Sequence, residues 1–187
     1  GWNYIWLGAS LKQEADLNSR PSIQVNSITR NRLLHSIAKI SGNPAKRIGI
    51  TVRKPWDDNI HTARIPGLIK TDKGTLIAVY DNRYISSKDL PGNIDVGMSR
   101  STDGGQTWEP MKVIMDMGAP HENNGIGGPT ALFDPVTKKI WVAAVWSKGN
   151  RAIGTSGPGL SPDSTAQFVL VSSADDGLTW SAPNSIT

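Results

Sequence analysis

The sequence predicts an all-β protein, on the strength of three observations. Segments rich in Val, Ile, Thr and Trp alternate with clusters of Gly, Pro, Asn and Asp along most of the 187 residues. The chain holds 19 glycines and 12 prolines, which suits many short strands joined by tight turns. No long stretch shows the 3.6-residue period of an amphipathic helix.

The expected strands follow in chain order. Residues 1–46 give two candidates, Ser22–Ile28 and Leu33–Ile40, and Ser41-Gly42-Asn43-Pro44 marks a boundary loop. From residue 47 the pattern becomes regular, and the expected strands are Ile48–Arg53, Thr75–Tyr80, Ile94–Ser99, Lys112–Met115, Ile140–Trp146 and Phe168–Ser172. We therefore divide the chain into residues 1–46, the end of a preceding β domain or a lead-in segment, and residues 47–187, the start of a repeat array.

Composition excludes several classes of site. The chain has no cysteine, which rules out disulfides, thiolate metal sites and thiol catalysis. Its three histidines, His35, His61 and His121, share no metal-ligand spacing, so we expect no metal and no cofactor. The longest apolar run, Ile140–Trp146, is far shorter than the roughly 20 residues of a membrane-spanning helix.

The net charge of +4 leaves two interpretations open. One is an ordinary surface, since lysines and arginines are scattered along the chain. The other is an anionic ligand such as an acidic sugar or a phosphate. A nucleic-acid partner is not expected, because no basic tract is interleaved with aromatic residues.

A motif of the form Ser-x-Asp-x-Gly-x-Thr-Trp occurs twice, from Ser101 to Trp108 and from Ser173 to Trp180. The Ser and Asp side chains can bond backbone N–H groups inside a hairpin turn, and the Gly allows a backbone conformation closed to other residues. The Trp can pack between neighbouring sheets. The motif is therefore a folding device rather than a catalytic one, and it resembles the Asp box of β-propellers.

Three further segments join the Asp boxes in one pattern: His61-Thr62-Ala63-Arg64-Ile65-Pro66-Gly67, Asp81-Asn82-Arg83 and Asp95-Val96-Gly97-Met98-Ser99-Arg100. Together they resemble the bacterial exo-sialidases (neuraminidases) of glycoside hydrolase family 33. The resemblance implies a six-bladed β-propeller that releases terminal sialic acid from sialylated glycans, in a secreted, periplasmic or cell-surface protein. A blade takes roughly 40–50 residues. Residues 47–187 would then hold about three blades, and we expect the rest from a C-terminal half beyond these 187 residues.

The resemblance implies that two arginines bind the substrate. Arg64 matches the first of three arginines that hold the sialic acid carboxylate, a task suited to the planar guanidinium fork. Arg83 matches an arginine that lies over the carboxylate and O4 side of the ligand. Two structural alternatives stay open, a surface salt bridge for Arg64 and a solvated charge at a strand end for Arg83.

Asp95 and Trp146 are the other two candidates. Asp95 matches the acid/base aspartate, which must hold a proton near working pH and so should be partly desolvated. Its alternative is a turn-forming Asp after Pro91-Gly92-Asn93. Trp146 matches an aromatic residue that lines the N-acetyl pocket, and its alternative is core packing.

The match to the family breaks in two places. Gly128 stands where the family has an Asp that contacts the sugar. Sialidases also use a Tyr nucleophile with a Glu base late in the chain, whereas the tyrosines here are Tyr4, Tyr80 and Tyr84 and no Tyr follows Asp95. We therefore expect these 187 residues alone to be inactive. The alternative for the whole protein is a non-catalytic propeller that binds sialic acid or another glycan.

Overall fold

The computed structural model describes residues 12, 15, 19–23, 25, 27–36, 49–118, 124–149 and 151–187. The chain forms two compact units, Gly1–Thr51 and Val52–Thr187, and each is described by itself. Among the described residues, no helix has the length and apolarity needed to cross a membrane. The assignment of residues 1–46 to a preceding β domain stays a prediction.

The first unit contains one short hairpin. Strands β1 (Ser27–Arg30) and β2 (Leu33–Ser36) pair antiparallel, with Ser27 opposite Ser36. Both turn residues, Asn31 and Arg32, have positive φ, as a two-residue hairpin turn requires. Of the two strands expected in this region, Leu33–Ile40 is present over its first four residues, and residues 37–40 lie outside the described part of the chain. The expected strand Ser22–Ile28 is wrong for most of its length, because the observed strand begins only at Ser27 and runs on to Arg30.

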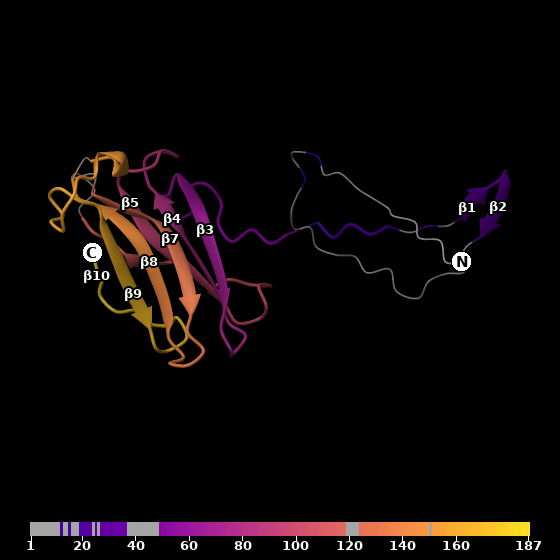
Figure 1. Cartoon of the computed structure of the whole chain (residues 1–187). Coiled ribbons are helices and arrows are strands. Elements are labelled where there is room, and N and C mark those ends of the chain that lie inside the picture. The colour runs from indigo at the N-terminus through magenta and orange to yellow at the C-terminus, as the bar shows by residue number, and fades with distance from the viewer. Residues whose placement is uncertain are drawn as a thin grey trace. The chain divides into compact units, whose positions relative to one another are not determined.

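The second unit is built from two four-stranded antiparallel sheets (Figure 1). Their strands are β3 (Thr62–Lys70), β4 (Leu76–Arg83), β5 (Ile94–Ser101), β6 (Lys112–Met115), β7 (Gly125–Phe133), β8 (Ile140–Ser147), β9 (Gln167–Ser173) and β10 (Asn184–Ser185). The spatial orders are β3-β4-β5-β6 and β10-β9-β8-β7. The all-β prediction is confirmed, and each sheet is one propeller blade. The chain thus holds two blades here rather than the expected three, because each blade with its loops is longer than the usual repeat.

Three strands were missed by the sequence analysis: the two-residue β10, and β3 and β7, which were missed for the same physical reason. β3 and β7 each contain a proline, Pro66 and Pro129, which predicts a break. In the structure each proline lies where the pairing register shifts, between Arg64 and Gly67 in β3 and between Gly127 and Thr130 in β7. Both strands are also at the end of their sheet, so the missing N–H disrupts no ladder.

One expected strand is wrong. Residues 49–53 form no strand, and Ile48 lies outside the described residues. The segment instead leads into a turn at Asp57–Asn59, a 3₁₀ helix whose N-cap, Trp56, has a positive φ of 71°. A β-branched composition stabilises a strand only where a neighbouring strand pairs with it.

The core lies between the two blades. Alternate residues of β4 and β5, including Ile77, Val79, Val96 and Met98, are fully buried and belong to one cluster with residues of β7, β8 and β9. The blades approach closely: a Cβ added to Gly177 would lie 2.7 Å from the Ile77 side chain. One face of the first blade, the face of Ile77, Val79 and Asp81, therefore packs on the second blade.

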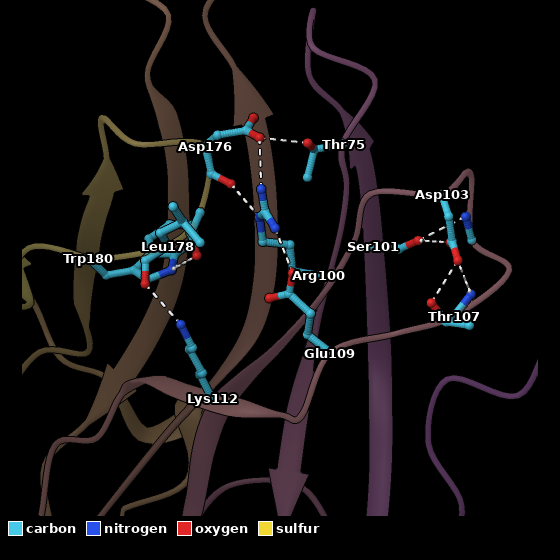
Figure 2. A network of polar contacts seen from close by, with 12 residues as sticks. Thr75, Arg100, Ser101, Asp103, Thr107, Glu109, Lys112, Asp176, Leu178 and Trp180 are labelled. Atoms are coloured by element: carbon cyan, nitrogen blue, oxygen red, sulfur yellow. Dashed lines mark hydrogen bonds and ion pairs between the residues drawn. The ribbon is translucent and has the colours of Figure 1, made fainter.

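The two Asp boxes have the predicted internal bonds, and Figure 2 shows those of the first box. In the first, Asp103 accepts bonds from the Thr107 backbone N–H and hydroxyl at 3.0 and 2.6 Å, and Ser101 Oγ accepts from the Gly105 N–H at 2.9 Å. The second repeats these bonds around Asp175. The Thr hydroxyls and then the backbone N–H donors lower the pKa of both aspartates to about 2. The motif is a closed turn, as expected of a folding device.

Candidate active site

Two arginines converge at one end of the first blade. Arg64 lies on β3 and Arg83 ends β4, in strands paired so that Arg64 is opposite Asp81. Their Nη1 atoms both donate to the backbone carbonyl of Ser87, at 3.4 Å from Arg64 and 2.8 Å from Arg83. Arg64 is exposed, and its long contact leaves guanidinium donors available to a ligand.

Arg83 is buried rather than a solvated charge. Its exposure is only 2%, and its Nε and Nη2 donate to Asp81 Oδ2 at 3.1 and 2.8 Å. Asp81 is fully buried, and its other oxygen accepts the Gly128 N–H at 2.8 Å. Arg83 and Asp81 share a strand face because they are two residues apart. This pair links the first blade to β7 of the second blade.

Asp95 lies on the other face of the first blade. It is opposite Asn82 in the β4–β5 register, so its side chain points away from the face that carries Asp81 and Arg83. Asp95 is 6% exposed, and its Oδ2 accepts the Tyr84 hydroxyl at 2.7 Å. Its Oδ1 is enclosed with no hydrogen-bond partner among the described residues. The structure therefore does not bring Asp95 together with Arg64 and Arg83.

The environment of Asp95 favours its neutral form. Burial raises the pKa of the Asp95 carboxyl to about 6, against the lowering effect of the Tyr84 hydroxyl, and the nearby Asp116 carboxylate adds to the rise. Burial also raises the pKa of Tyr84, as does the Asp95 carboxylate. Asp95 is desolvated as expected, but the same burial also closes its carboxyl off from solvent.

The sequence analysis missed Asp89. This residue lies in the loop of residues 84–93 between β4 and β5, and its Oδ1 is 3.4 Å from Arg83 Nη2. Its side chain is 68% exposed. Neighbouring residues of the loop, Lys88 among them, line a hollow of about 260 Å³ together with Arg83 and Ile94. An acidic residue in a loop rich in Ser, Pro and Gly gives no periodic signal, and only its place just after Arg83 could have indicated it.

Trp146 is on β8 of the second blade, and it is half-buried against the core. Its indole N–H donates to Asn124 Oδ1 at 2.9 Å. The buried Asn124 also donates to the Met117 carbonyl at 2.7 Å and accepts the Gly149 N–H at 3.2 Å. Core packing, the structural alternative for Trp146, accounts for part of its contacts. Across the described ranges, no group of three or more His, Asp or Glu side chains is placed to hold a metal ion.

Known proteins are similar to the chain over most or all of its length. It is 45% identical to a sialidase of Bacteroides fragilis (strain YCH46), across 100% of the chain and 36% of that protein. It is 36% identical to a sialidase of Micromonospora viridifaciens, across 63% of the chain and 18% of that protein. The chain thus spans about a third or less of the curated relatives it matches. No protein-family model matches it.

Solved structures give the same result. The Hadza microbial sialidase Hz136 superposes with a TM-score of 0.71 at 44% identity, over 82% of this chain and 32% of that one. The intramolecular trans-sialidase of Ruminococcus gnavus has a TM-score of 0.65 at 15% identity, over 74% of this chain and 51% of that one, and shows the fold alone. These comparisons confirm the resemblance that the Arg-Ile-Pro segment and the Asp boxes indicate.

Proposed function

Because this chain belongs to the sialidase family, we propose that the whole protein hydrolyses terminal sialic acid from glycoconjugates. The observation that supports this best is the convergence of Arg64 and Arg83 on one carbonyl oxygen, that of Ser87. Two guanidinium groups directed at one point form a site for an anion, and sialic acid carries its carboxylate at the reacting carbon. The basic net charge of +4 suits an acidic sugar.

Arg64 is the proposed ligand for the sialic acid carboxylate. Its guanidinium is exposed, whereas Arg83 is occupied by Asp81, Ser87 and Asp89. A planar fork that stays charged at all working pH values can donate two parallel bonds to a carboxylate. Arg83 would then contribute mainly by fixing the loop of residues 84–93 and by adding positive charge below the ligand. Trp146 is the proposed wall of the N-acetyl pocket.

Two carboxyls compete for the acid/base role, and they differ in access. Asp95, the candidate from the sequence pattern, has a pKa of about 6 that suits a general acid, but it is 6% exposed and faces away from the arginines. Asp89 is exposed and lies next to Arg83. A general acid must come within hydrogen-bond distance of the glycosidic oxygen. We therefore favour Asp89 for proton transfer and keep Asp95 as the second candidate.

The carboxylate-binding role is tested with Arg64→Ala in the full-length protein. Loss of a hydrogen bond to a charged group costs about 1.5–3 kcal/mol, so kcat/KM for 3′-sialyllactose should fall about 10- to 100-fold. Arg64→Lys keeps the charge but not the fork, and it should recover only part of that loss. If Arg64→Ala left both KM and kcat unchanged, the proposed site would be wrong.

The acid/base role is tested by the choice of leaving group. Asp89→Asn and Asp95→Asn are compared on 3′-sialyllactose, whose leaving group needs a proton, and on 4-nitrophenyl sialoside, whose leaving group does not. Removing the true acid should cost about 100-fold or more on sialyllactose and much less on the nitrophenyl substrate. A variant that loses equal activity on both substrates has lost structure or binding instead.

The alternative function is a non-catalytic propeller that binds sialylated glycans. Gly128, which replaces an expected Asp, favours it. Calorimetry with 3′-sialyllactose separates the two: binding without any turnover by the full-length protein would support the alternative. Under either function we propose a secreted, periplasmic or cell-surface location, since sialylated glycans are found outside the cell. We also propose that residues 1–46 end a preceding β domain.

A further inference from the structure

The loop of residues 84–93 is fastened from the first blade at three points. At its base the Tyr84 N–H donates to the Asn93 carbonyl at 3.4 Å. The Tyr84 hydroxyl reaches Asp95 at 2.7 Å, and Arg64 and Arg83 both hold the Ser87 carbonyl. These contacts fix the first half of the loop and its last residue, Asn93, and Arg83 also reaches Asp89 at 3.4 Å. They leave open what holds the stretch from Leu90 to Gly92.

The second blade supplies that contact through Gly125, the first residue of β7. A Cβ built on Gly125 would overlap the carbonyl oxygen of Gly92 and lie 2.7 Å from Leu90 Cδ2 and 3.2 Å from the Ile94 nitrogen. Leu90 is an apolar loop residue with an exposure of only 8%. The backbone of β7 therefore packs directly against the loop, at a distance that only glycine permits.

We infer that Gly125 is a positioning residue for the active site, because it lets β7 clamp the loop that carries Asp89. Asp89 lies between two fastened points, Ser87 on one side and Leu90 on the other. Its carboxylate is 3.4 Å from Arg83, so a shift of Leu90 moves it relative to both arginines. Misplacing a catalytic group by about 1 Å can cost about 100-fold in rate. The inference rests on the proposed function for its kinetic consequence, but not for the contact itself.

The first test is Gly125→Ala in the full-length protein, with Gly154→Ala as the matched control. A Cβ at Gly154 meets nothing within 4 Å. For Gly125→Ala we expect kcat on 3′-sialyllactose to fall at least tenfold, KM to stay within about threefold, and the loss on 4-nitrophenyl sialoside to be smaller. The control should match the wild type on both substrates. Equal kinetics for Gly125→Ala and wild type would overturn the inference.

Hydrogen exchange supplies a readout that does not depend on activity. In Gly125→Ala the amides of the 84–93 loop should exchange at least tenfold faster, while those of β4 and β5 stay protected. If the full-length protein hydrolysed no sialoside, the proposed function would fail, and exchange would still decide the positioning role. Faster exchange spread evenly over both blades would mean that Gly125 serves packing alone.

A second variant keeps the inference testable if Gly125→Ala does not fold. Leu90→Ala removes the loop's side of the same contact without introducing an atom. We expect the same pattern on a smaller scale: faster exchange confined to the loop, lower kcat on sialyllactose and little change in KM. Leu90→Ala with unchanged loop exchange would show that the contact with β7 does not hold the loop.

Discussion

At the scale of single residues, Asp95 holds a proton that its surroundings favour. The unfolded chain releases that proton near the usual pKa of 3.8, whereas burial raises the folded pKa to about 6. The contribution of Asp95 to stability is therefore fully present below about pH 4 and is lost as the pH rises through about 6. We therefore expect the Tyr84–Asp95 pair to contribute more to the stability of the first blade in mild acid than at neutral pH.

Asp95→Asn should remove that pH dependence. Asn cannot ionise, yet its carbonyl oxygen can still accept the Tyr84 hydroxyl. The free energy of unfolding of the wild type should fall relative to the variant between pH 4 and pH 6 and run parallel to it above pH 7. Urea unfolding at each pH measures this. Asp116→Asn is a useful companion, because removing its charge should shift the transition to lower pH. Parallel curves from pH 4 to pH 7 would contradict the expectation.

Gly128 stands where the resemblance to the family predicts an Asp. Its φ is +65°, and a Cβ there would meet nothing within 4 Å. Asp tolerates this backbone conformation better than most residues do, so Gly128→Asp should fold, at a cost of about 1 kcal/mol.

If the ligand lies over Arg64, Gly128→Asp should restore a sugar contact. One hydrogen bond contributes about 0.5–1.5 kcal/mol, which predicts a 2- to 10-fold lower KM for 3′-sialyllactose. Gly74→Asp is the control, since Gly74 has a similar φ of +87° and equally open surroundings but lies in the β3–β4 turn, away from the arginines. Equal effects from the two variants would mean that residue 128 does not face the sugar.

At the scale of elements, the second Asp box does more than close its own turn. Figure 2 shows Asp176, inside that box, reaching back to Arg100 of β5 and Thr75 of the first blade. Arg100 donates to the Asp176 carbonyl at 2.9 Å and to its carboxylate at 3.1 Å, and Thr75 donates at 2.6 Å. The matching position in the first box is Gly104, which has no side chain to offer. One box therefore joins two blades, and the other does not.

Asp176→Asn should weaken this joint while preserving the turn, because Asn accepts the positive φ of 63° that Asp176 adopts. Both partners of the ion pair are about one-tenth exposed, so we expect the free energy of unfolding to fall by about 2 kcal/mol. Asp163→Asn breaks an exposed pair with Lys148 and should cost less than about 0.5 kcal/mol. Chemical denaturation of both variants gives the comparison, and equal losses would count against a joint between blades.

The elements that the sequence predicted are those whose signal is local. The strands β4, β5, β6, β8 and β9 contain β-branched runs bounded by turn residues, and each was expected to within a few residues. β3 and β7 were not, because Pro66 and Pro129 lie at register shifts that only pairing with a neighbour defines. The strand expected at residues 49–53 is absent for the converse reason: the segment has the composition of a strand but no neighbouring strand pairs with it.

At the scale of the whole molecule, some residues of the proposed site belong to sequence motifs and others do not. Arg64 and Arg83 were identifiable because a fixed local pattern surrounds each of them. Asp89 was not, because its place beside Arg83 depends on how the loop between β4 and β5 folds back on its own blade. Gly125 was not, because its proposed role depends on a contact between a loop of one blade and a strand of the next. Asp95 was proposed from the resemblance to the family, but strand pairing decides which face its carboxyl occupies. The face of a blade on which a side chain lies, and its distance from the next blade, are set only when the fold is assembled.

The arrangement of the tyrosines predicts what the 187 residues can do alone. Tyr80 bonds Ser99 at 2.6 Å and Tyr84 bonds Asp95, on the face opposite Arg83, so neither presents a free hydroxyl beside Arg64; Tyr4 lies outside the described residues. Because no tyrosine of the described residues offers a nucleophile near the arginines, the isolated chain should release no 4-methylumbelliferone from its sialoside, whereas the full-length protein should. Measurable hydrolysis by the isolated chain, abolished by Arg64→Ala, would contradict this and would place a complete site within two blades.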